Sequence, residues 1–243
     1  MVKQKVKGRV HEQEKHQTVG GILSAIPHNV RLAIIWIVIL AAVFFAFNYF
    51  FQNIWTPGIV KYEGLTFTKE NVGAITVYHY AYIYQDSTGQ LAQNNIYLRN
   101  NPAGNKISTS GNITYVSDRT TYIGIDTDGL VGCNDSSVAI AELAGFLKDG
   151  GVWIKGGSLN KTTAIELNST YVNCEIQNLN LSAVIQVKMA DETRVSASGL
   201  CYTVQAASCA NVIPAVERFI VESIVQAKAN TLANYKSIQN KTV

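Results

Sequence analysis

The stretch Leu32–Phe51, LAIIWIVILAAVFFAFNYFF, decides the layout of this chain, because Asn48 is its only strongly polar side chain. At about 1.5 Å per residue, a helix of this length spans about 30 Å, the thickness of the hydrocarbon core of a bilayer. The flanking segments are polar, which argues against a helix buried in a large soluble core. The sequence therefore predicts one transmembrane helix at residues 32–53, and its lack of charge favours a tether over a pore.

Positive charge before this stretch predicts its direction across the membrane. Basic residues favour the cytoplasmic side of a membrane span. We therefore expect residues 1–31 to form a cytoplasmic basic tail and residues 54–243 to form an extracytoplasmic domain at the cell membrane. The expected partners are the lipid bilayer and a protein or envelope component, without nucleic acid. The basic residues before the span are Lys3, Lys5, Lys7, Arg9, Lys15 and Arg31.

A cleaved signal peptide is the main alternative to a permanent anchor, since it is also basic and then apolar. Its apolar core is usually shorter, and its charged leader rarely reaches thirty residues. The small residues Ala41, Ala42 and Ala46 lie inside the apolar run and not after it. The sequence thus favours an uncleaved signal anchor.

All four cysteines, Cys133, Cys174, Cys201 and Cys209, fall in residues 54–243. In an oxidising compartment, an even set of cysteines usually forms disulfides. Three pairings are possible, and we favour Cys133 with Cys174 and Cys201 with Cys209. Zinc is the alternative, but there is no Cys-x-x-Cys pair and His79 is the only histidine of this region.

Residues 54–243 show strand signals first and helix signals later, which predicts one α+β domain with a mixed sheet and two main helices. The strand signals are short runs of β-branched and aromatic residues bounded by Gly, Asn, Asp and Ser. Gln85–Gln90 and Ala190–Glu192 are expected to be hairpin turns. The expected strands are Ile75–Tyr84, Asn95–Arg99, Thr114–Val116, Thr121–Ile125, Val152–Ile154, Ala183–Val187, Thr193–Val195 and Cys201–Gln205.

The first main helix is expected to begin at Asp135 or Ser136, run through Leu147 and stop at Gly150. A shorter helical turn is expected near residues 163–167.

The second main helix is expected to follow Asn211 as its cap, with Pro214 in the first turn and fraying after Asn230. A broad apolar stripe predicts an inward face along this helix. Its opposite face, expected in solvent, carries Glu217, Arg218, Glu222 and Gln226.

Arg99, Asn100 and Asn101 form the most promising polar cluster, at the end of an expected strand. A guanidinium with adjacent amides can hold a carboxylate or phosphate. The simpler alternative is that Arg99 stabilises its own turn.

Asp126 and Asp128, in the run Asp126-Thr-Asp128-Gly129, resemble the start of a calcium loop. The third acidic ligand and the glutamate at the twelfth position are missing, so a surface turn is favoured over weak calcium binding. His79 lies in an expected strand, where Asp86 could orient it. The sequence contains no Gly-x-Ser-x-Gly elbow and no His-Glu-x-x-His motif, so it predicts neither a catalytic residue nor a cofactor.

Six Asn-x-Ser/Thr sequons occur in the region expected outside the cell, which is compatible with a glycoprotein. An Asn- and Thr-rich domain produces several sequons by chance. The sequon asparagines are Asn112, Asn134, Asn160, Asn168, Asn180 and Asn240.

Four short stretches behind one N-terminal span resemble an uncharacterised family of small archaeal single-pass membrane proteins. They are Ile96-Tyr-Leu-Arg-Asn-Asn-Pro102, Cys133 with Ala141–Leu147, Cys201-Tyr202 with Cys209, and Glu217-Arg-Phe-Ile220. The resemblance implies an archaeal cell membrane and a Cys201–Cys209 pair, and it brings no activity or cofactor.

The sequence therefore favours a membrane-anchored extracytoplasmic binding or assembly module over an enzyme. The alternatives are a bitopic subunit of a secretion, division or pilus machine, and a small-ligand receptor or ectoenzyme that uses the Arg99 region.

Overall fold

The structure is a computed structural model that describes residues 27–50, 58–85, 90–114, 119–175 and 182–239. The chain divides into two compact units, residues 1–56 and 57–243.

The described part of the first unit is one apolar helix, α1, His28–Phe50. Its segment His28–Tyr49 has a mean hydropathy of 2.7 and none of it is buried within the chain, so it is long and apolar enough to span a membrane. No other helix among the described residues meets this condition. The helix begins four residues before the expected start at Leu32, because His28, Asn29, Val30 and Arg31 add one more turn.

The second unit begins with a four-stranded antiparallel sheet in the order β1-β2-β3-β4. The turn between β1 and β2 consists of Glu63 and Gly64, both with positive φ, as tight two-residue hairpin turns require. The central strand β3 pairs with β4 from Tyr78 opposite Leu98 to Gln85 opposite Leu91. The strands are β1 Ile59–Tyr62, β2 Leu65–Val72, β3 Ile75–Gln85 and β4 Leu91–Leu98.

A seven-stranded mixed sheet follows, in the order β5-β10-β11-β9-β6-β7-β8. Its strands pair in parallel except for β10 and β11, which are antiparallel. The strands are β5 Ser108–Ser110, β6 Thr120–Ile125, β7 Trp153–Ser158, β8 Thr170–Tyr171, β9 Ser182–Met189, β10 Arg194–Ser198 and β11 Cys201–Ala206.

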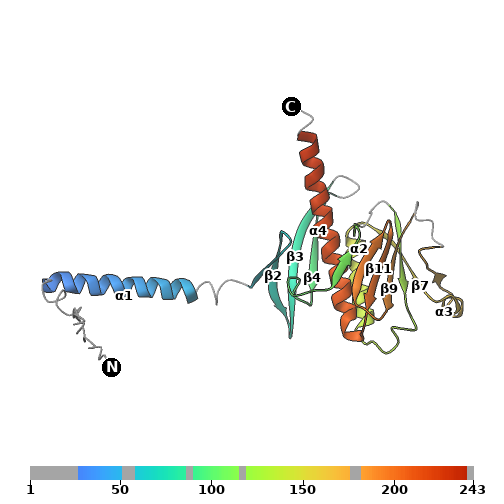
Figure 1. Cartoon of the computed structure of the whole chain (residues 1–243), viewed down its shortest axis with the longest axis horizontal. Coiled ribbons are helices and arrows are strands. Elements are labelled where there is room, and N and C mark those ends of the chain that lie inside the picture. The colour runs from blue at the N-terminus through green and yellow to red at the C-terminus, as the bar shows by residue number, and fades with distance from the viewer. Residues whose placement is uncertain (1–26, 51–57, 86–89, 115–118, 176–181, 240–243) are drawn as a thin grey trace, which may run out of the picture. The chain divides into compact units, whose positions relative to one another are not determined.

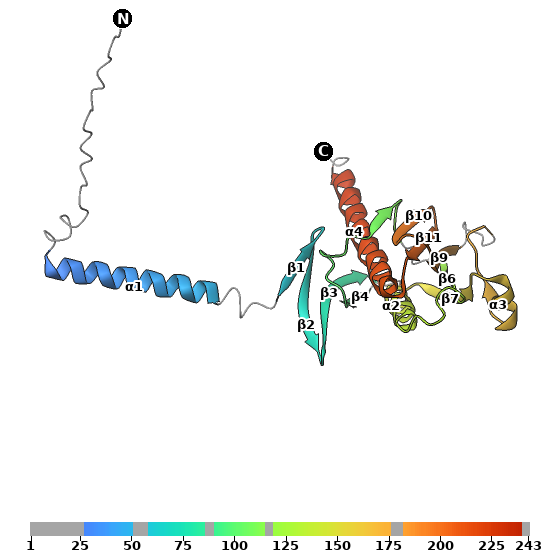
Figure 2. The same cartoon turned by 60° about the horizontal axis from the view of Figure 1, so that its bottom comes forward.

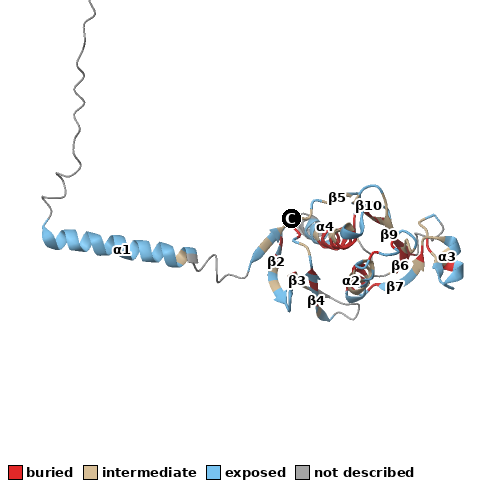
Figure 3. Ribbon diagram, turned by 90° about the horizontal axis from the view of Figure 1, so that it is seen from below, coloured by how far each residue is buried: buried red, intermediate tan, exposed pale blue. Residues whose placement is uncertain are grey.

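Two long helices, α2 Ser136–Asp149 and α4 Val212–Gln239, lie between the two sheets (Figures 1 and 3). A 3-10 turn, Cys209–Asn211, leads into α4, and the short helix α3, Lys161–Glu166, lies beside β7 and β8 (Figure 2). The buried side chains of both sheets and both helices form one hydrophobic core. Its largest fully buried members include Phe67, Leu98, Leu143, Tyr202 and Phe219.

The α+β class is confirmed, but the single mixed sheet expected from the sequence is replaced by two sheets. The expected hairpin at Ala190–Glu192 is wrong, because β11 returns to lie between β9 and β10 and pairs with both. The turn expected at Gln85–Gln90 falls mostly outside the described residues, although β3 and β4 do pair antiparallel. The strand expected at Thr114–Val116 also falls mostly outside them.

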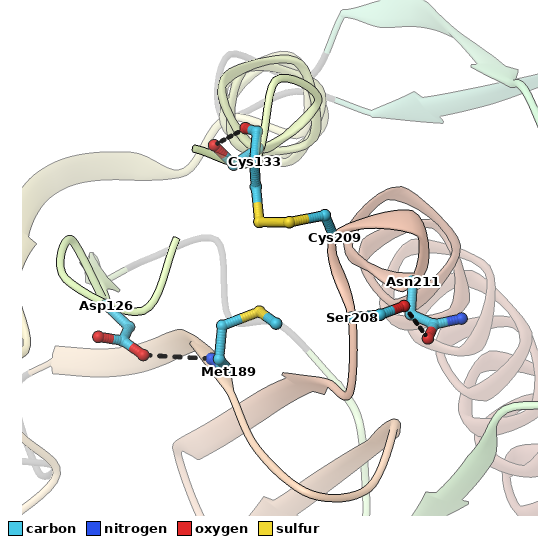
Figure 4. Close-up of a disulfide and its surroundings, with 7 residues drawn as sticks. Asp126, Cys133, Met189, Ser208, Cys209 and Asn211 are labelled. Atoms are coloured by element: carbon cyan, nitrogen blue, oxygen red, sulfur yellow. Dashed lines mark hydrogen bonds between the residues drawn. A yellow bond between two sulfur atoms is a disulfide. The ribbon is translucent and has the colours of Figure 1, made fainter. Parts of the chain in front are cut away.

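The two main helices, α2 and α4, occur where the sequence predicts them, but the residues at which they end differ from the prediction. Asp135 directly precedes α2 without a side-chain capping bond, and the Ser136 hydroxyl donates to the Cys133 carbonyl at 2.7 Å. The expected fraying after Asn230 is wrong, since α4 continues to Gln239. The Asn211 side chain accepts a hydrogen bond from the Ser208 hydroxyl at 2.7 Å, just before α4 begins (Figure 4).

All four cysteines form disulfides, but the favoured pairing is wrong. Cys133 pairs with Cys209 and Cys174 pairs with Cys201, with Cα–Cα distances of 5.1 and 5.7 Å. Cys133 lies just before α2 and Cys209 just before α4, and these two helices pack side by side. Their N-terminal ends therefore meet, and the Cys133–Cys209 bond joins them (Figure 4).

Candidate functional site

The loop after β4, which contains Arg99, Asn100 and Asn101, is held by a glutamate of α4. The main-chain nitrogen of Arg99 donates to Glu217 Oε1, and that of Asn100 lies 3.2 and 3.1 Å from Oε1 and Oε2. The Asn100 side-chain nitrogen donates to Glu217 Oε2 at 2.7 Å. Asn101 Oδ1 accepts from the main-chain nitrogen of Ala103. The main-chain nitrogens of Arg99 and Asn100 and the side-chain amide of Asn100 therefore bind a carboxylate of the chain itself, and the positive charge of Arg99 acts on the same carboxylate.

Glu217 is only 1% exposed, so its expected position in solvent is wrong. A buried carboxylate is costly unless hydrogen bonds compensate it, and the loop after β4 supplies them. Ile213 and Val221, four residues before and after Glu217 on the same helix face, are also buried. Apolar residues on this second face were the sequence signal that α4 is covered on both sides.

A second polar group on α4 faces β1. Arg218 Nη2 lies 3.1 Å from Glu222 Oε1, and the Tyr62 hydroxyl donates to the same oxygen at 2.9 Å. The Arg218 guanidinium lies 5.2 Å from the centre of the Tyr62 ring. Burial, followed by the hydrogen bond to Glu222, raises the pKa of Tyr62. Glu222 is buried too, so its expected exposure is also wrong.

Gln226, the fourth residue expected in solvent, is half-buried. Its Oε1 accepts a hydrogen bond from the main-chain nitrogen of Ile113 at 2.6 Å. This bond holds the loop after β5 against α4.

Glu142 on α2 is a second carboxyl group near this loop, and the residue as a whole is half-buried. Its Oε1 atom is buried and has no hydrogen-bond partner among the described residues. Burial, and then the negative charge of Glu217, raise the pKa of Glu142 to about 8, while Arg99 opposes the rise. Burial also raises the pKa of Glu217, against the hydrogen bonds from Asn100 and Arg99.

The donors around the two carboxyl groups decide which of them carries a proton at neutral pH. Glu217 accepts hydrogen bonds from three nitrogen donors, which favour its ionised form. Glu142 Oε1 accepts none among the described residues, so the proton resides on Glu142. A single glutamate in a helix gives no sequence signal that it is protonated in the fold, so sequence reasoning missed Glu142.

A hollow of about 250 Å³ lies between β4 and α2, beside Glu142. Asn95, Ile96 and Tyr97 line it from β4, and Glu142, Gly145 and Asp149 line it from α2, with Phe146 and Ile220. We call this hollow the β4–α2 groove. It combines an exposed strand edge with a carboxyl oxygen that lacks a donor.

The two aspartates considered for calcium have structural partners instead. Asp126 accepts hydrogen bonds from the main-chain nitrogens of Gly129 at 3.0 Å and Met189 at 3.2 Å. Figure 4 shows the bond to Met189. Asp128 accepts bonds from the Asn160 side-chain nitrogen and, at 3.1 Å, from the Thr163 hydroxyl. Among the described residues, no three His, Cys, Asp or Glu side chains gather as a metal site would need. These carboxylates connect the loop after β6 to α3 and β9.

His79 lies on the outer face of the four-stranded sheet, and Asp86 lies outside the described residues. The Nδ1 atom of His79 is 2.9 Å from Glu70 Oε1, and its Nε2 atom is 3.1 Å from Asn95 Oδ1. The ring stacks on Tyr97 with centroids 4.6 Å apart. His79 is therefore positioned by three neighbours of its own sheet.

Among the sequon asparagines, Asn112, Asn134 and Asn168 are exposed. Asn160 is half-buried, and its side chain caps α3 by accepting from the main-chain nitrogens of Thr162 and Thr163. Asn180 and Asn240 lie outside the described residues.

The bonds to Glu217 predict that Glu217→Gln destabilises the domain by about 1–3 kcal/mol, because an amide replaces one acceptor oxygen with a donor facing Asn100. Urea unfolding of the purified full chain would measure this loss. Glu166→Gln, at an exposed position of α3, is the matched control. A Glu217→Gln variant as stable as the wild type would contradict the assigned hydrogen bonds.

Comparisons of the chain with protein-family models, with curated proteins and with solved structures find no match.

Proposed function

We propose that this chain is a membrane-anchored binding or assembly module whose domain lies outside the cytoplasm and contacts a protein or envelope partner. In this proposal, α1 spans the membrane and the basic tail lies in the cytoplasm. The observation that carries it is the pair of disulfides in the second unit, since such bonds persist in oxidising compartments. The basic residues before α1 support the same direction.

The polar groups of the domain favour binding over catalysis. The donors of Asn100 and the acceptors of Asp126 and Asp128 are engaged in bonds within the chain. A receptor or enzyme site at Arg99–Asn101 therefore has less support than the sequence suggests, because nitrogens of this loop donate hydrogen bonds to Glu217. A bitopic subunit of a larger machine remains an alternative with the same layout.

An apolar groove offers a surface that a partner can use. It has a volume of about 410 Å³ and lies between β3 and the exposed part of α4. Tyr80, Tyr82 and Ile83 line it from β3, and Lys228 and Leu232 line it from α4. Aromatic side chains such as Tyr80 and Tyr82 are enriched at protein interaction surfaces.

A membrane-impermeant amine crosslinker applied to intact cells would test location and binding together. We expect crosslinks to a partner, or to a second copy, through domain lysines such as Lys155, Lys188 and Lys228. We expect none through the tail lysines Lys3 and Lys5. Mass spectrometry of the crosslinked peptides would identify both.

A membrane-permeant crosslinker with the same reactive group is the control, since it should also reach the tail. Modification of tail lysines by the impermeant reagent would contradict the orientation. Recovery of only the uncrosslinked chain with several spacer lengths would contradict the binding role.

A further inference from the structure

The four-stranded sheet has one long, unprotected edge. Natural sheets protect their edges with short strands, charged side chains, proline or bulges. β4 has eight residues, LAQNNIYL, without a charge, a proline or a glycine. Two of its exposed side chains are apolar or aromatic, with Leu91 78% and Tyr97 48% exposed.

The other sheet edges in the described part of the chain have such protection. β1 is four residues long and carries Lys61. β5 and β8, the edges of the seven-stranded sheet, have three and two residues. The absence of protection is thus specific to β4.

The main chain of β4 is accessible from the side. Asn95, Ile96 and Tyr97 are consecutive, and their side chains point to alternate faces of the sheet, yet all three line the β4–α2 groove. The strand edge itself therefore faces the groove. On the opposite wall, a Cβ atom at Gly145 would meet nothing within 4 Å, so this wall is recessed.

We propose that β4 pairs with β4 of a second copy of this chain, in antiparallel orientation, to form a continuous eight-stranded sheet. Self-pairing brings no like charges together, because β4 has none. In the central register, the exposed amide of Asn95 lies opposite Asn95 of the second copy, and an amide can both donate and accept hydrogen bonds. A two-fold axis through this Asn95 pair closes the assembly as a dimer.

This inference deepens the proposed assembly role by naming its partner. It can fail while the role and the membrane location still hold, because the test below uses purified protein in detergent.

The test measures the mass of the full-length chain in detergent micelles over a hundredfold range of concentration, by light scattering and sedimentation. We expect a dimer. Hydrogen exchange of the wild type should show amides of Leu91–Leu98 becoming protected as the dimer forms. A chain that stays monomeric with fast exchange in β4 overturns the proposal.

The variant Gln93→Lys with Tyr97→Lys places cations at exposed positions of β4, where residue 93 of one copy lies opposite residue 97 of the other. We expect it to weaken dimerisation by about tenfold or more. Ile59→Lys, at an exposed position of the opposite edge strand β1, is the matched control and should leave the dimer intact.

A dimer that resists the β4 charges, for example one formed by α1, overturns the pairing. A monomeric chain whose β4 amides are protected only when another protein copurifies also overturns it, in favour of a foreign strand. Circular dichroism of each variant checks its folding, and the wild-type exchange data decide the question if the double variant does not fold.

Discussion

Replacing Cys133 and Cys209 by alanine is expected to destabilise the domain more than replacing Cys174 and Cys201. The first pair closes a loop with a sequence separation of 76 residues and the second a loop of 27 residues. The chain-entropy relation gives a loss of about 4–5 kcal/mol for the longer loop and about 3–4 kcal/mol for the shorter one. The Cys133–Cys209 bond also joins the N-terminal ends of the two core helices, whereas Cys174–Cys201 joins the loop after β8 to β11.

Urea unfolding of both double variants and the wild type, as full chains in one detergent, would measure these losses. Peptide mass mapping without reduction would first establish the two pairs. The Cys174→Ala/Cys201→Ala variant is the internal control, since it also loses one disulfide. If all three proteins had equal free energies of unfolding, or if the order of the two variants were reversed, loop-closure entropy would not explain how these disulfides affect stability.

The cysteine pairing shows why the sequence could not supply every contact. Pairing between cysteines depends on which elements lie next to each other in the fold. Local sequence patterns predict neither the two-sheet arrangement nor the contact between α2 and α4. The strands and helices themselves follow from periodicity and turn residues, and most were predicted within a few residues. The topology was not, because β11 returns between β9 and β10 although Ala190–Glu192 has the composition of a hairpin turn.

The candidate site was predicted only in part, for a related reason. The loop Arg99–Asn101 was singled out for its donors, but the acceptor of three of its nitrogens, Glu217, lies more than a hundred residues away in the chain. Glutamates in a helix normally face water, so Glu217 and Glu222 were assigned to solvent. A helix between two sheets has no such face, and these carboxylates are buried with donors from β1 and from the loop after β4.

Glu142 is expected to make the stability of this domain fall as the pH rises from about 4.5 to about 8. In the unfolded chain its carboxyl group ionises near its ordinary pKa of 4.5, whereas in the fold its pKa is about 8. Between these values the folded state retains a proton that the unfolded state has released. Stability therefore decreases by up to about 1.4 kcal/mol per pH unit, to a ceiling of about 4–5 kcal/mol. Below this window both states are protonated, and above it both are ionised, so no further change arises from this group.

Glu142→Gln tests this directly, because glutamine has nearly the same shape and never ionises. We expect wild type and variant to have similar free energies of unfolding at pH 4 and the variant to be more stable by several kcal/mol at pH 9, as measured by urea unfolding at each pH. Glu166→Gln on α3 is the matched control, since Glu166 is exposed and its substitution should leave the pH dependence unchanged. Parallel curves for the wild type and Glu142→Gln would mean that Glu142 is ionised in the fold. The proton assigned to Glu142 would then have to be withdrawn, because Glu142 and Glu217 would both be charged beside Arg99.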